Sequence, residues 1–282
     1  MLDSYPDLSG QTAFITGTTR GIGKALALSL AERGCNIVST GKTVDDSDSD
    51  LEGTIHKTAE ACEEKGVDAH AIQLDVRSEE KVSAAVDEAI DVFGDINIVI
   101  NNASAIQLKD VEEMPANRFD LMTEVNVRGT YLVSREFIPH LKNQDNAWIL
   151  TNSPPVKVDR SPGKAAYAWS KLGMSFITLS LASELEEHNI GCNTFWPVTA
   201  IDTRATRYFG LGSEEDWRTP QIVADTVLEI LKQDPESFTG NAVYDEEFLE
   251  ESAGITDFSD YNVVEDSEPP ALSAMMFDPE YL

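Results

Sequence analysis

A tyrosine and a lysine stand four positions apart in the segment AAYAWSKLGM, residues 165–174, which has the pattern of a helix. Positions i and i+4 of an α-helix are neighbours, with Cβ atoms about 5–6 Å apart, so the ammonium of Lys171 can reach the phenol of Tyr167. Such a pair can transfer a proton to or from a substrate oxygen. The same spacing also arises by chance in unrelated helices, so the pair alone leaves a catalytic and a structural interpretation open.

A glycine-rich segment, TGTTRGIG at residues 16–23, follows an apolar strand-like run and precedes a helical pattern. Here Gly17 permits a sharp turn, Gly21 lets the backbone approach a pyrophosphate, and Gly23 allows close helix packing. The N-terminus of the helix then offers its free N–H groups to the anion. A glycine turn without a ligand is the alternative, but the strand before and the helix after it favour dinucleotide binding.

The segment STGKT, residues 39–43, bears on which dinucleotide is bound. An acid at the end of the second strand normally bonds the ribose 2′-hydroxyl of NAD, whereas Gly41 and Lys42 stand there in this chain. Arg20 adds a second cation, and Arg and Lys pair with phosphate. NADP is therefore favoured, and NAD stays possible because acids follow at positions 45, 46, 48 and 50.

Apolar, β-branched runs alternate with helix-period segments along the chain, which predicts βαβ units and a parallel sheet. We expect an α/β fold: a single domain with a doubly wound, parallel, seven-stranded, Rossmann-like sheet and helices on both faces. Strands are predicted at residues 12–17, 36–40, 69–75, 96–101, 147–152, 190–196 and 241–245. Helices are predicted to begin near Ile22, Thr54, Ser78, Asn117, Tyr167 and Gln221.

Three segments interrupt this alternation. Residues 43–53 form an acidic loop, and residues 198–219 lie where open α/β sheets keep a mobile substrate lid. The domain is expected to span residues 8–245. Residues 246–282 hold three prolines and no long periodic run, so we expect an irregular extension that packs on the domain or on a partner subunit.

The composition excludes several classes of function. With 50 acidic and 21 basic residues, the formal net charge is −29, which disfavours binding to nucleic acid or to a membrane surface. The acids are spread along the chain, as expected for a halophilic surface adaptation to a salt-rich cytoplasm. No apolar run of membrane-spanning length and no signal-peptide pattern is present. Cys35, Cys62 and Cys192 indicate neither a disulfide framework nor a zinc site, so a cytoplasmic, soluble protein is expected.

The motifs together resemble the short-chain dehydrogenase/reductase family over roughly residues 8–245. They are T-G-x-x-x-G-x-G, Asp75, NNAS at 101–104, Asn126, a serine ending the fifth strand, and Y-x-x-x-K. Further segments, among them NNASAIQL, NVRGTYLVS, NSPPVK and WPVTAIDT, resemble one subgroup of that family. The tail resembles the segment that follows the dehydrogenase domain in the same subgroup.

The resemblance implies a catalytic set of four residues. Ser153 would hydrogen-bond the substrate oxygen, Tyr167 would pass the proton, and Asn126 would anchor a water in the relay. Lys171 would hold the nicotinamide ribose and lower the pKa of the tyrosine, which is near 10 when free. Hydride transfer belongs to the nicotinamide, so no metal is expected.

The resemblance also implies the cofactor contacts, with Asp75 at the adenine and Thr203 at the nicotinamide carboxamide or the phosphates. Three departures from the family pattern bear on the substrate: Ser104 replaces a glycine, Val198 follows Pro197 where glycine is usual, and Ser153 lies 14 residues before Tyr167. The full set of expected cofactor contacts is Gly17, Thr19, Arg20, Gly21, Ile22, Gly23, Lys42, Asp75, Val76, Asn102, Ala103, Tyr167, Lys171, Pro197 and Thr203.

The expected function is NADP-dependent interconversion of an alcohol and a carbonyl, on a lipophilic small molecule. A non-catalytic nucleotide-binding or scaffold protein, and an isomerase or dehydratase on the same fold, are the alternatives. The family implies a homo-oligomer, a tetramer or a dimer, paired through the helices that hold Asn126 and Tyr167. Apolar pocket walls are expected from Ile106, Leu108, Val156, Val158, Phe209, Leu211 and Trp217.

Overall fold

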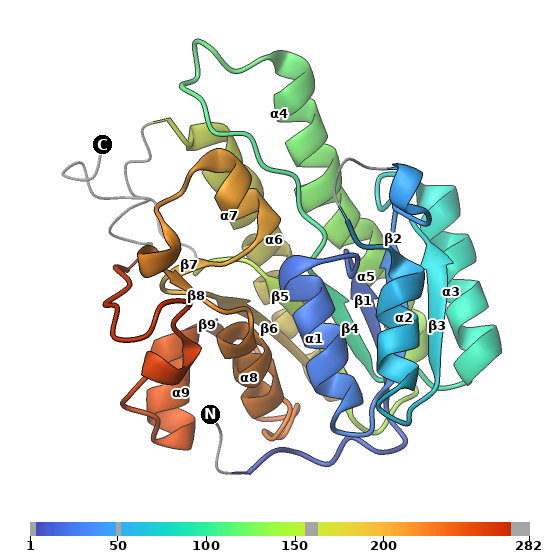
Figure 1. Ribbon diagram of the computed structural model, residues 1–282. Coiled ribbons are helices and arrows are strands. Elements are labelled where there is room, and N and C mark those ends of the chain that lie inside the picture. The colour runs from blue at the N-terminus through green and yellow to red at the C-terminus, as the bar shows by residue number, and fades with distance from the viewer. Residues whose placement is uncertain (1–3, 49–51, 156–162, 272–282) are drawn as a thin grey trace.

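Seven parallel strands form one sheet in a computed structural model that describes residues 4–48, 52–155 and 163–271. The strand order is β3-β2-β1-β4-β5-β6-β9, which confirms the predicted doubly wound sheet (Figure 1). Each predicted strand segment holds one of them. The strands are β1 (Thr12–Thr16), β2 (Asn36–Gly41), β3 (Ala69–Gln73), β4 (Ile98–Asn101), β5 (Ala147–Asn152), β6 (Ile190–Trp196) and β9 (Ala242–Tyr244).

Helices cover both faces of this sheet. On one face, apolar side chains of α1 and α8 form a core with β1, and α2 packs beside α1; on the other, α3, α5 and α6 form a second core. Every residue of β1, β4 and β5 is buried, as expected for parallel strands that are covered on both faces. The helices are α1 (Gly21–Ala31), α2 (Ile55–Glu63), α3 (Glu79–Phe93), α5 (Gly129–Leu141), α6 (Ala165–Glu184) and α8 (Gln221–Ile230).

Local sequence signals explain where several helices begin and end. The Thr54 hydroxyl accepts a hydrogen bond from the Lys57 N–H at 3.1 Å, and Ser78 accepts one from Lys81 at 3.3 Å, so both act as N-caps. Gly94, with φ of +76°, ends α3. The observed starts of α2 and α3, Ile55 and Glu79, each lie one residue after the predicted start.

The helix α4 (Ala116–Met122) runs into a π-helical turn, η2 (Thr123–Arg128), and from there into α5. A π-turn inserts one extra residue into the helical repeat and is frequent at functional sites. Here it contains Asn126, which is fully buried. The turn therefore directs the amide of this residue into the protein interior.

The 198–219 segment has more regular structure than its sequence predicts. It contains β7 (Ala200–Ile201), α7 (Arg204–Phe209), η4 (Glu214–Asp216) and β8 (Trp217–Arg218), with β7 and β8 paired as a separate two-stranded sheet. These elements are too short to produce a periodic pattern. The 3₁₀ turns elsewhere are η1 (Asp46–Asp48), η3 (Glu186–His188) and η5 (Ser259–Tyr261).

The tail was expected to be irregular, but its first part is a helix, α9 (Asp245–Ala253), which packs on α8. Its first turn holds Asp245, Glu246 and Glu247, and acids are favourable at a helix N-terminus. The apolar Phe248 and Leu249 are buried. Further along, the Tyr261 hydroxyl donates a 2.7 Å hydrogen bond to Asp225 of α8. Only the part of the tail up to residue 271 belongs to the described residues.

Candidate active site

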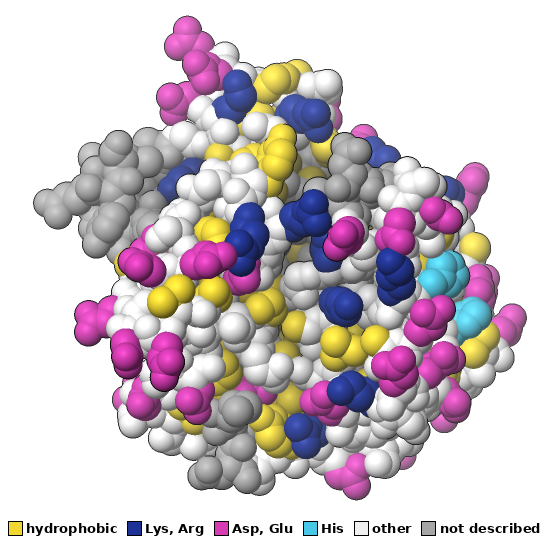
Figure 2. All heavy atoms as spheres, in the orientation of Figure 1, with side chains coloured by type: hydrophobic (Ala, Val, Ile, Leu, Met, Phe, Trp, Pro, Cys, Tyr) yellow, Lys and Arg dark blue, Asp and Glu magenta, His cyan; other side chains and the backbone are white. Residues whose placement is uncertain are grey.

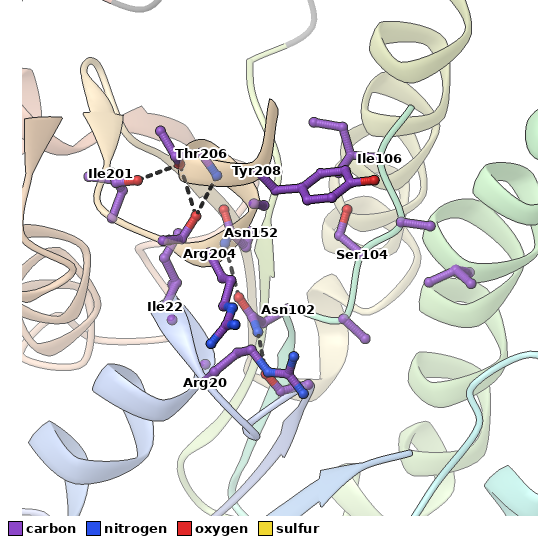
Figure 3. Close-up of a pocket in the computed structure, with 18 of the residues that line it drawn as sticks. Arg20, Ile22, Asn102, Ser104, Ile106, Asn152, Ile201, Arg204, Thr206 and Tyr208 are labelled. Carbon is purple, nitrogen blue, oxygen red and sulfur yellow. Dashed lines mark hydrogen bonds between the residues drawn. The ribbon is translucent and has the colours of Figure 1, made fainter. Parts of the chain in front are cut away.

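A pocket of about 1060 Å³ opens at the carboxyl ends of the central strands. It lies where the strand order reverses, between β1 and β4, which is the usual ligand site of an open α/β sheet. Its walls come from the glycine loop, the loop after β4, the start of α6 and the segment around α7 (Figure 3). All fifteen residues predicted to contact the cofactor line this pocket.

The glycine loop has the shape that a dinucleotide requires. Gly17 has φ of +75° and Gly21 has φ of +55°, a left-handed conformation that favours glycine. A Cβ at Gly23 would lie 2.1 Å from the Gly17 carbonyl oxygen, so the loop closes against α1 only because a side chain is absent. The first N–H groups of α1 are thereby presented to the pocket, where they favour an anion.

The loop is held from behind by two asparagines. The Asn102 amide donates to the carbonyl oxygens of Thr16 and Gly17 at 3.0 and 3.2 Å. The Asn152 amide donates to Asn102 Oδ1 at 3.0 Å. Because Asn152 ends β5 and Asn102 follows β4, the sheet itself fixes the position of the glycine loop.

Three cations surround the glycine loop: Arg20, Lys42 and Arg204. Figure 3 shows the side chains of Arg20 and Arg204 extending into the same part of the pocket from opposite sides. Burial, and then the neighbouring charge of Arg204, lower the pKa of Arg20. Within the described residues, the buried Nε of Arg20 has no hydrogen-bond partner. This cluster fits the phosphates of a dinucleotide, which would supply the missing acceptors.

Among the described acids that follow Lys42, Asp45, Asp46 and Asp48 lie outside the pocket lining. Asp46 bonds Lys57 at 2.6 Å. Asp75 does line the pocket, and Arg77 Nη2 lies 2.6 Å from its carboxylate, which holds its pKa below the usual range. Positions 49–51 of the acidic loop lie outside the described residues. The described surroundings of Lys42 are therefore compatible with a bound phosphate.

Tyr167 and Lys171 both line the pocket from the start of α6. Lys171 Nζ donates a 2.9 Å hydrogen bond to the backbone oxygen of Asn152 and lies 5.2 Å from the centre of the Trp196 ring. Burial lowers the pKa of Lys171 to about 7 and raises the pKa of Tyr167. In the protein alone, burial thus outweighs any effect of the ammonium on the phenol, so a lowered tyrosine pKa would require a further positive charge in the pocket.

Asn126 lies behind the pocket wall and not in its lining. Its amide forms a two-way bridge to the backbone of Ala105: Oδ1 accepts from the N–H at 2.7 Å, and Nδ2 donates to the carbonyl at 2.9 Å. Nδ2 is also 2.9 Å from Ser170 Oγ on α6. Asn126 therefore ties the loop after β4 to the helix that holds Tyr167.

Ser153 is the predicted catalytic residue that the structure places farthest from its expected role. It is fully buried, its Oγ lies 2.9 Å from Ser175 Oγ, and it does not line the pocket. The residue before it, Asn152, does line the pocket.

The far end of the pocket is largely apolar. Of the predicted wall residues, four line it: Ile106, Leu108, Phe209 and Leu211. Trp217 is buried beside it and donates through Nε1 to the Leu211 carbonyl. Val156 and Val158 lie outside the described residues. Figure 3 shows Tyr208 and Ile106 near each other at this end.

The loop after β6 is held by a residue that the sequence did not single out. Pro197 lines the pocket, and the N–H of the next residue, Val198, donates a 2.8 Å hydrogen bond to Asp245 of α9. Asp245 is buried, which raises its pKa to about 7. Thr203 caps α7 by accepting from the Thr206 N–H at 3.2 Å. No sequence pattern links Val198 to Asp245, because the two residues lie 47 positions apart in the chain.

Other lining residues missed by sequence reasoning are cations and amides on neighbouring elements. Their types gave no signal, because single Lys, Arg and Asn residues occur throughout the chain. They are Arg118, Asn152, Lys164 and Arg204.

Among the described residues, no cluster of three or more His, Cys, Asp or Glu side chains is placed to hold a metal ion.

This fold and site define the dehydrogenase class, and the family model for short chain dehydrogenases matches residues 11–211. The chain belongs to the short-chain dehydrogenase family. It is 45% identical to human hydroxysteroid dehydrogenase-like protein 2 over 93% of this chain and 63% of the human protein, which confirms the predicted subgroup. The chain spans between 50% and 63% of the length of such curated relatives.

Solved structures agree with this assignment. A putative dehydrogenase from Xanthomonas campestris superposes with a TM-score of 0.90 at 38% identity, covering 94% of this chain and 98% of that one. A metagenomic short-chain oxidoreductase, solved in complex with NADP, shares the fold with a TM-score of 0.71 at 24% identity, covering 85% of this chain and 98% of that one. In the described part of this chain, no helix is both long and apolar enough to span a membrane.

Proposed function

We propose that the protein is a nicotinamide-dependent oxidoreductase that interconverts an alcohol and a carbonyl. The observation that carries this proposal is the joint presence of Tyr167, Lys171 and the glycine loop in the lining of one pocket. A dinucleotide on the glycine loop would supply or accept the hydride. The chain itself then has to orient the substrate carbon, exclude water and move one proton.

Tyr167 is the proposed proton donor in reduction and acceptor in oxidation. Tyr167 is 7% exposed and lines the pocket. Lys171 is proposed to bind the ribose and to supply positive charge that favours the phenolate. Asn126 contributes by fixing Ala105 against α6 through its two-way bridge; a role in anchoring a water of the proton relay is part of the proposal.

Ser153 is given no substrate contact in this proposal, because its hydroxyl is directed toward Ser175. The substrate oxygen would be bound chiefly by the phenol of Tyr167.

NADP is proposed as the preferred cofactor, with NAD as the alternative. Arg20, Lys42 and Arg204 form a cationic site beside the end of β2, and Arg and Lys match a phosphate. Glycine stands at position 41, where a carboxylate would select NAD. The apolar far end of the pocket supports a lipophilic substrate.

We also propose a homo-oligomer, a dimer or a tetramer, in a salt-rich cytoplasm. Large aromatic side chains are exposed on neighbouring helices: Trp169 by 48% and Phe176 by 67% on α6, and Tyr131 by 49% on α5. Phe119 of α4 stacks on Trp169 at 5.3 Å. Exposed aromatic residues gathered in this way are typical of interfaces. Sedimentation at monomer mass would contradict this part of the proposal.

The test is NADPH oxidation, followed by absorbance, with a panel of long-chain aldehydes and ketones. Tyr167→Phe removes the transferable proton and is expected to lower kcat by about 10²–10⁴-fold, the usual contribution of general acid–base catalysis. NADPH binding, measured by its fluorescence, should stay within about threefold of wild type. Wild-type turnover by this variant would exclude the mechanism.

A non-catalytic nucleotide-binding protein is the alternative function. It would bind NADPH and fail to oxidise it with any member of the panel. Tyr167 and Lys171 both line the pocket, which favours the enzyme over the non-catalytic alternative.

A further inference from the structure

The 198–219 segment forms one wall of the pocket, but it lies outside the main sheet. Most residues between 199 and 212 line the pocket. The two strands of the segment, β7 and β8, form a sheet of their own. Within the described residues, the hydrogen-bond ladder of the main sheet therefore does not include this wall. Contacts with other parts of the chain must hold it in place.

Two consecutive residues at the start of α9 hold the two ends of this segment. Asp245 accepts the 2.8 Å hydrogen bond from the N–H of Val198, where the segment begins. Glu246 Oε1 lies 2.8 Å from Nη1 of Arg218 on β8, where the segment ends. Figure 1 shows β7 and β8 between α7 and α9. The first turn of α9 therefore joins both ends of the pocket wall.

Asp245 and Glu246 differ from the other acids of the same helix in being turned inward. Glu247, Glu250 and Glu251 are exposed, and Figure 2 shows magenta side chains on the surface over α9. By contrast, Asp245 is 1% exposed and the side chain of Glu246 is 23% exposed. Burying a carboxylate costs free energy unless it is paired. The two inward acids therefore depend on the partners that the pocket wall supplies.

Arg218 contacts the tail through both its side chain and its backbone. The side chain is 10% exposed, and the guanidinium carbon lies 5.1 Å from the centre of the Phe258 ring. The backbone at and around Arg218 pairs with residues 261–263. Burial raises the pKa of Glu246, and the charge of Arg218 opposes this rise. A guanidinium suits this position, because it can pair with a carboxylate and lie over an aromatic ring at once.

The contacts continue from Arg218 to α7, which faces the pocket. The Arg218 carbonyl accepts a 2.8 Å hydrogen bond from the Asp202 N–H. The Asp202 carboxylate accepts from Nε and Nη2 of Arg207 on α7, at 2.7 and 2.9 Å. On either side of Arg207, Thr206 and Tyr208 line the pocket. Two consecutive contacts thus connect Arg218 to the pocket lining.

The start of α7 lies against the cofactor end of the pocket. A Cβ placed on Gly21 would be 3.4 Å from Thr203 Cγ2, so Thr203 lies beside the glycine loop. Arg204 is the first residue of α7 and also lines the pocket. A shift of α7 would therefore change how the protein contacts a dinucleotide, even where the glycine loop itself stays in place.

We propose that Arg218 is a positioning residue, which holds α7 where it can bind the dinucleotide. Arg218 acts through its pairing with Glu246 and does not itself line the described pocket. The tail thereby becomes part of the structure that builds the cofactor site. The identity of the ligand as a dinucleotide rests on the proposed function, whereas the support of α7 by Arg218 does not.

The test measures amide hydrogen exchange in α7, together with the NADPH dissociation constant by fluorescence, in the whole chain. The variants are Glu246→Gln, Arg218→Met and the two combined. Loss of one partner from a buried ion pair is strongly destabilising, whereas loss of both partners is often tolerated. The double variant therefore keeps the test decisive if a single variant does not fold, which thermal melts show.

In the folded variants, the amides of α7 should exchange at least about threefold faster than in wild type, and the NADPH dissociation constant should rise at least about threefold. The amides of α1 should exchange at the wild-type rate. At saturating NADPH and substrate, kcat should stay within about twofold of wild type, because a positioning role in cofactor binding acts on KM.

Glu229→Gln is the matched control. It breaks a 2.6 Å ion pair with Lys232 on α8, in which the Glu229 side chain is 2% exposed and lies outside the pocket lining. This variant should change neither the exchange of α7 nor the NADPH dissociation constant, even where it lowers the melting temperature.

Wild-type exchange in α7, or a wild-type NADPH dissociation constant, in a folded double variant would overturn the inference. An equal effect of Glu229→Gln would also overturn it, since a general loss of stability would then explain the result. Turnover is measured separately on the same proteins. Faster α7 exchange and weaker NADPH binding in the double variant, with no turnover by wild type, would reject the proposed function and retain the role of Arg218. Normal turnover with unchanged exchange and affinity would do the reverse.

Discussion

Ser175 Oγ lies 2.9 Å from Ser153 Oγ, so the serine that ends β5 in the sequence motif is bonded to the interior face of α6. Ser175 Oγ also lies within hydrogen-bond distance of the Pro154 carbonyl. Two hydroxyls and a carbonyl thus hold the chain as it leaves β5. Ser153 therefore supports the wall of the pocket from behind and does not line the pocket.

Ser153→Ala is therefore expected to leave kcat within about threefold of wild type and to lower the free energy of unfolding by about 1 kcal/mol, the usual worth of a buried hydrogen bond. Steady-state NADPH oxidation and urea unfolding measure the two effects. Ser175→Ala is the matched control and should behave similarly. If turnover instead falls by about two orders of magnitude at unchanged stability, the usual scale for a lost transition-state hydrogen bond, Ser153 contacts the substrate.

Lys42→Asp is expected to move the cofactor preference toward NAD. A carboxylate there can accept from the ribose 2′-hydroxyl and repels a 2′-phosphate. The ratio of NADPH to NADH dissociation constants, measured by fluorescence, should change by at least tenfold, which is about 1.4 kcal/mol. Lys24→Asp, on α1 outside the pocket lining, is the control. If the ratio stays the same, Arg20 or Arg204 determines the preference.

Lys171 should make the cofactor-free protein more stable as the pH rises. Its pKa is about 7 in the folded protein and about 10.4 in an unfolded chain. Between these values the unfolded chain binds a proton that the folded protein lacks, so the free energy of unfolding rises with pH. Lys171→Met should raise the free energy of unfolding at pH 7 and flatten its rise between pH 7 and 9.

Urea unfolding at the two pH values measures this, with Lys109→Met as the exposed control. An equal pH dependence in wild type and Lys171→Met would contradict the depressed pKa. Lys171→Met should also lose turnover. A variant that is more stable but inactive would show that the buried ammonium lowers stability and is needed for activity.

Asp245 should hold the loop after β6 through the Val198 N–H, which it accepts at 2.8 Å. Asp245→Ala leaves this N–H without its acceptor, and we expect a loss of about 1–3 kcal/mol in stability and a severalfold higher KM for NADPH. Asp245→Asn retains an acceptor oxygen and should keep KM near that of wild type. Equal KM values for NADPH in Asp245→Ala and wild type would show that the contact from α9 does not affect cofactor binding.

The Asp245 titration has the opposite sign from that of Lys171. Its pKa is raised to about 7 by burial, from about 3.9 in an unfolded chain. The stability that it contributes is full below the unfolded value and is lost as the pH rises through 7. Between pH 5 and 8, wild type should lose stability relative to Asp245→Asn; parallel curves would contradict this.

The formal charge of −29 predicts stabilisation by salt. Like charges on the surface repel each other in the folded state, and salt screens them with a Debye length of about 10 Å at 0.1 M and about 3 Å at 1 M. The melting temperature should rise by several degrees between 0.1 and 2 M KCl. A melting temperature that does not change with salt would reject the halophilic interpretation of the acidic surface.

The sequence predicted the sheet because its signals are local. β-branched runs at 12–17 and 147–152 mark buried parallel strands, and a glycine at position 23 marks a close approach wherever the rest of the chain lies. The predicted residues of the glycine loop line one pocket together with Tyr167 and Lys171. These residues could be predicted because each motif is local in the sequence. The helix α7 was missed because six residues give too little periodicity. The helix α9 was missed because the prolines farther along the tail predicted an irregular extension.

By itself, the sequence determined the Rossmann-like fold, the glycine loop and the helical spacing of Tyr167 and Lys171, since each depends on neighbours within a few residues. Only the tertiary structure decided that Ser153 faces Ser175, that Asp245 holds Val198, and that Arg118 and Lys164 share a pocket with Arg20. These relationships join segments far apart in the chain. Burial and distance fix them, and neither quantity exists before the sheet has brought those segments together.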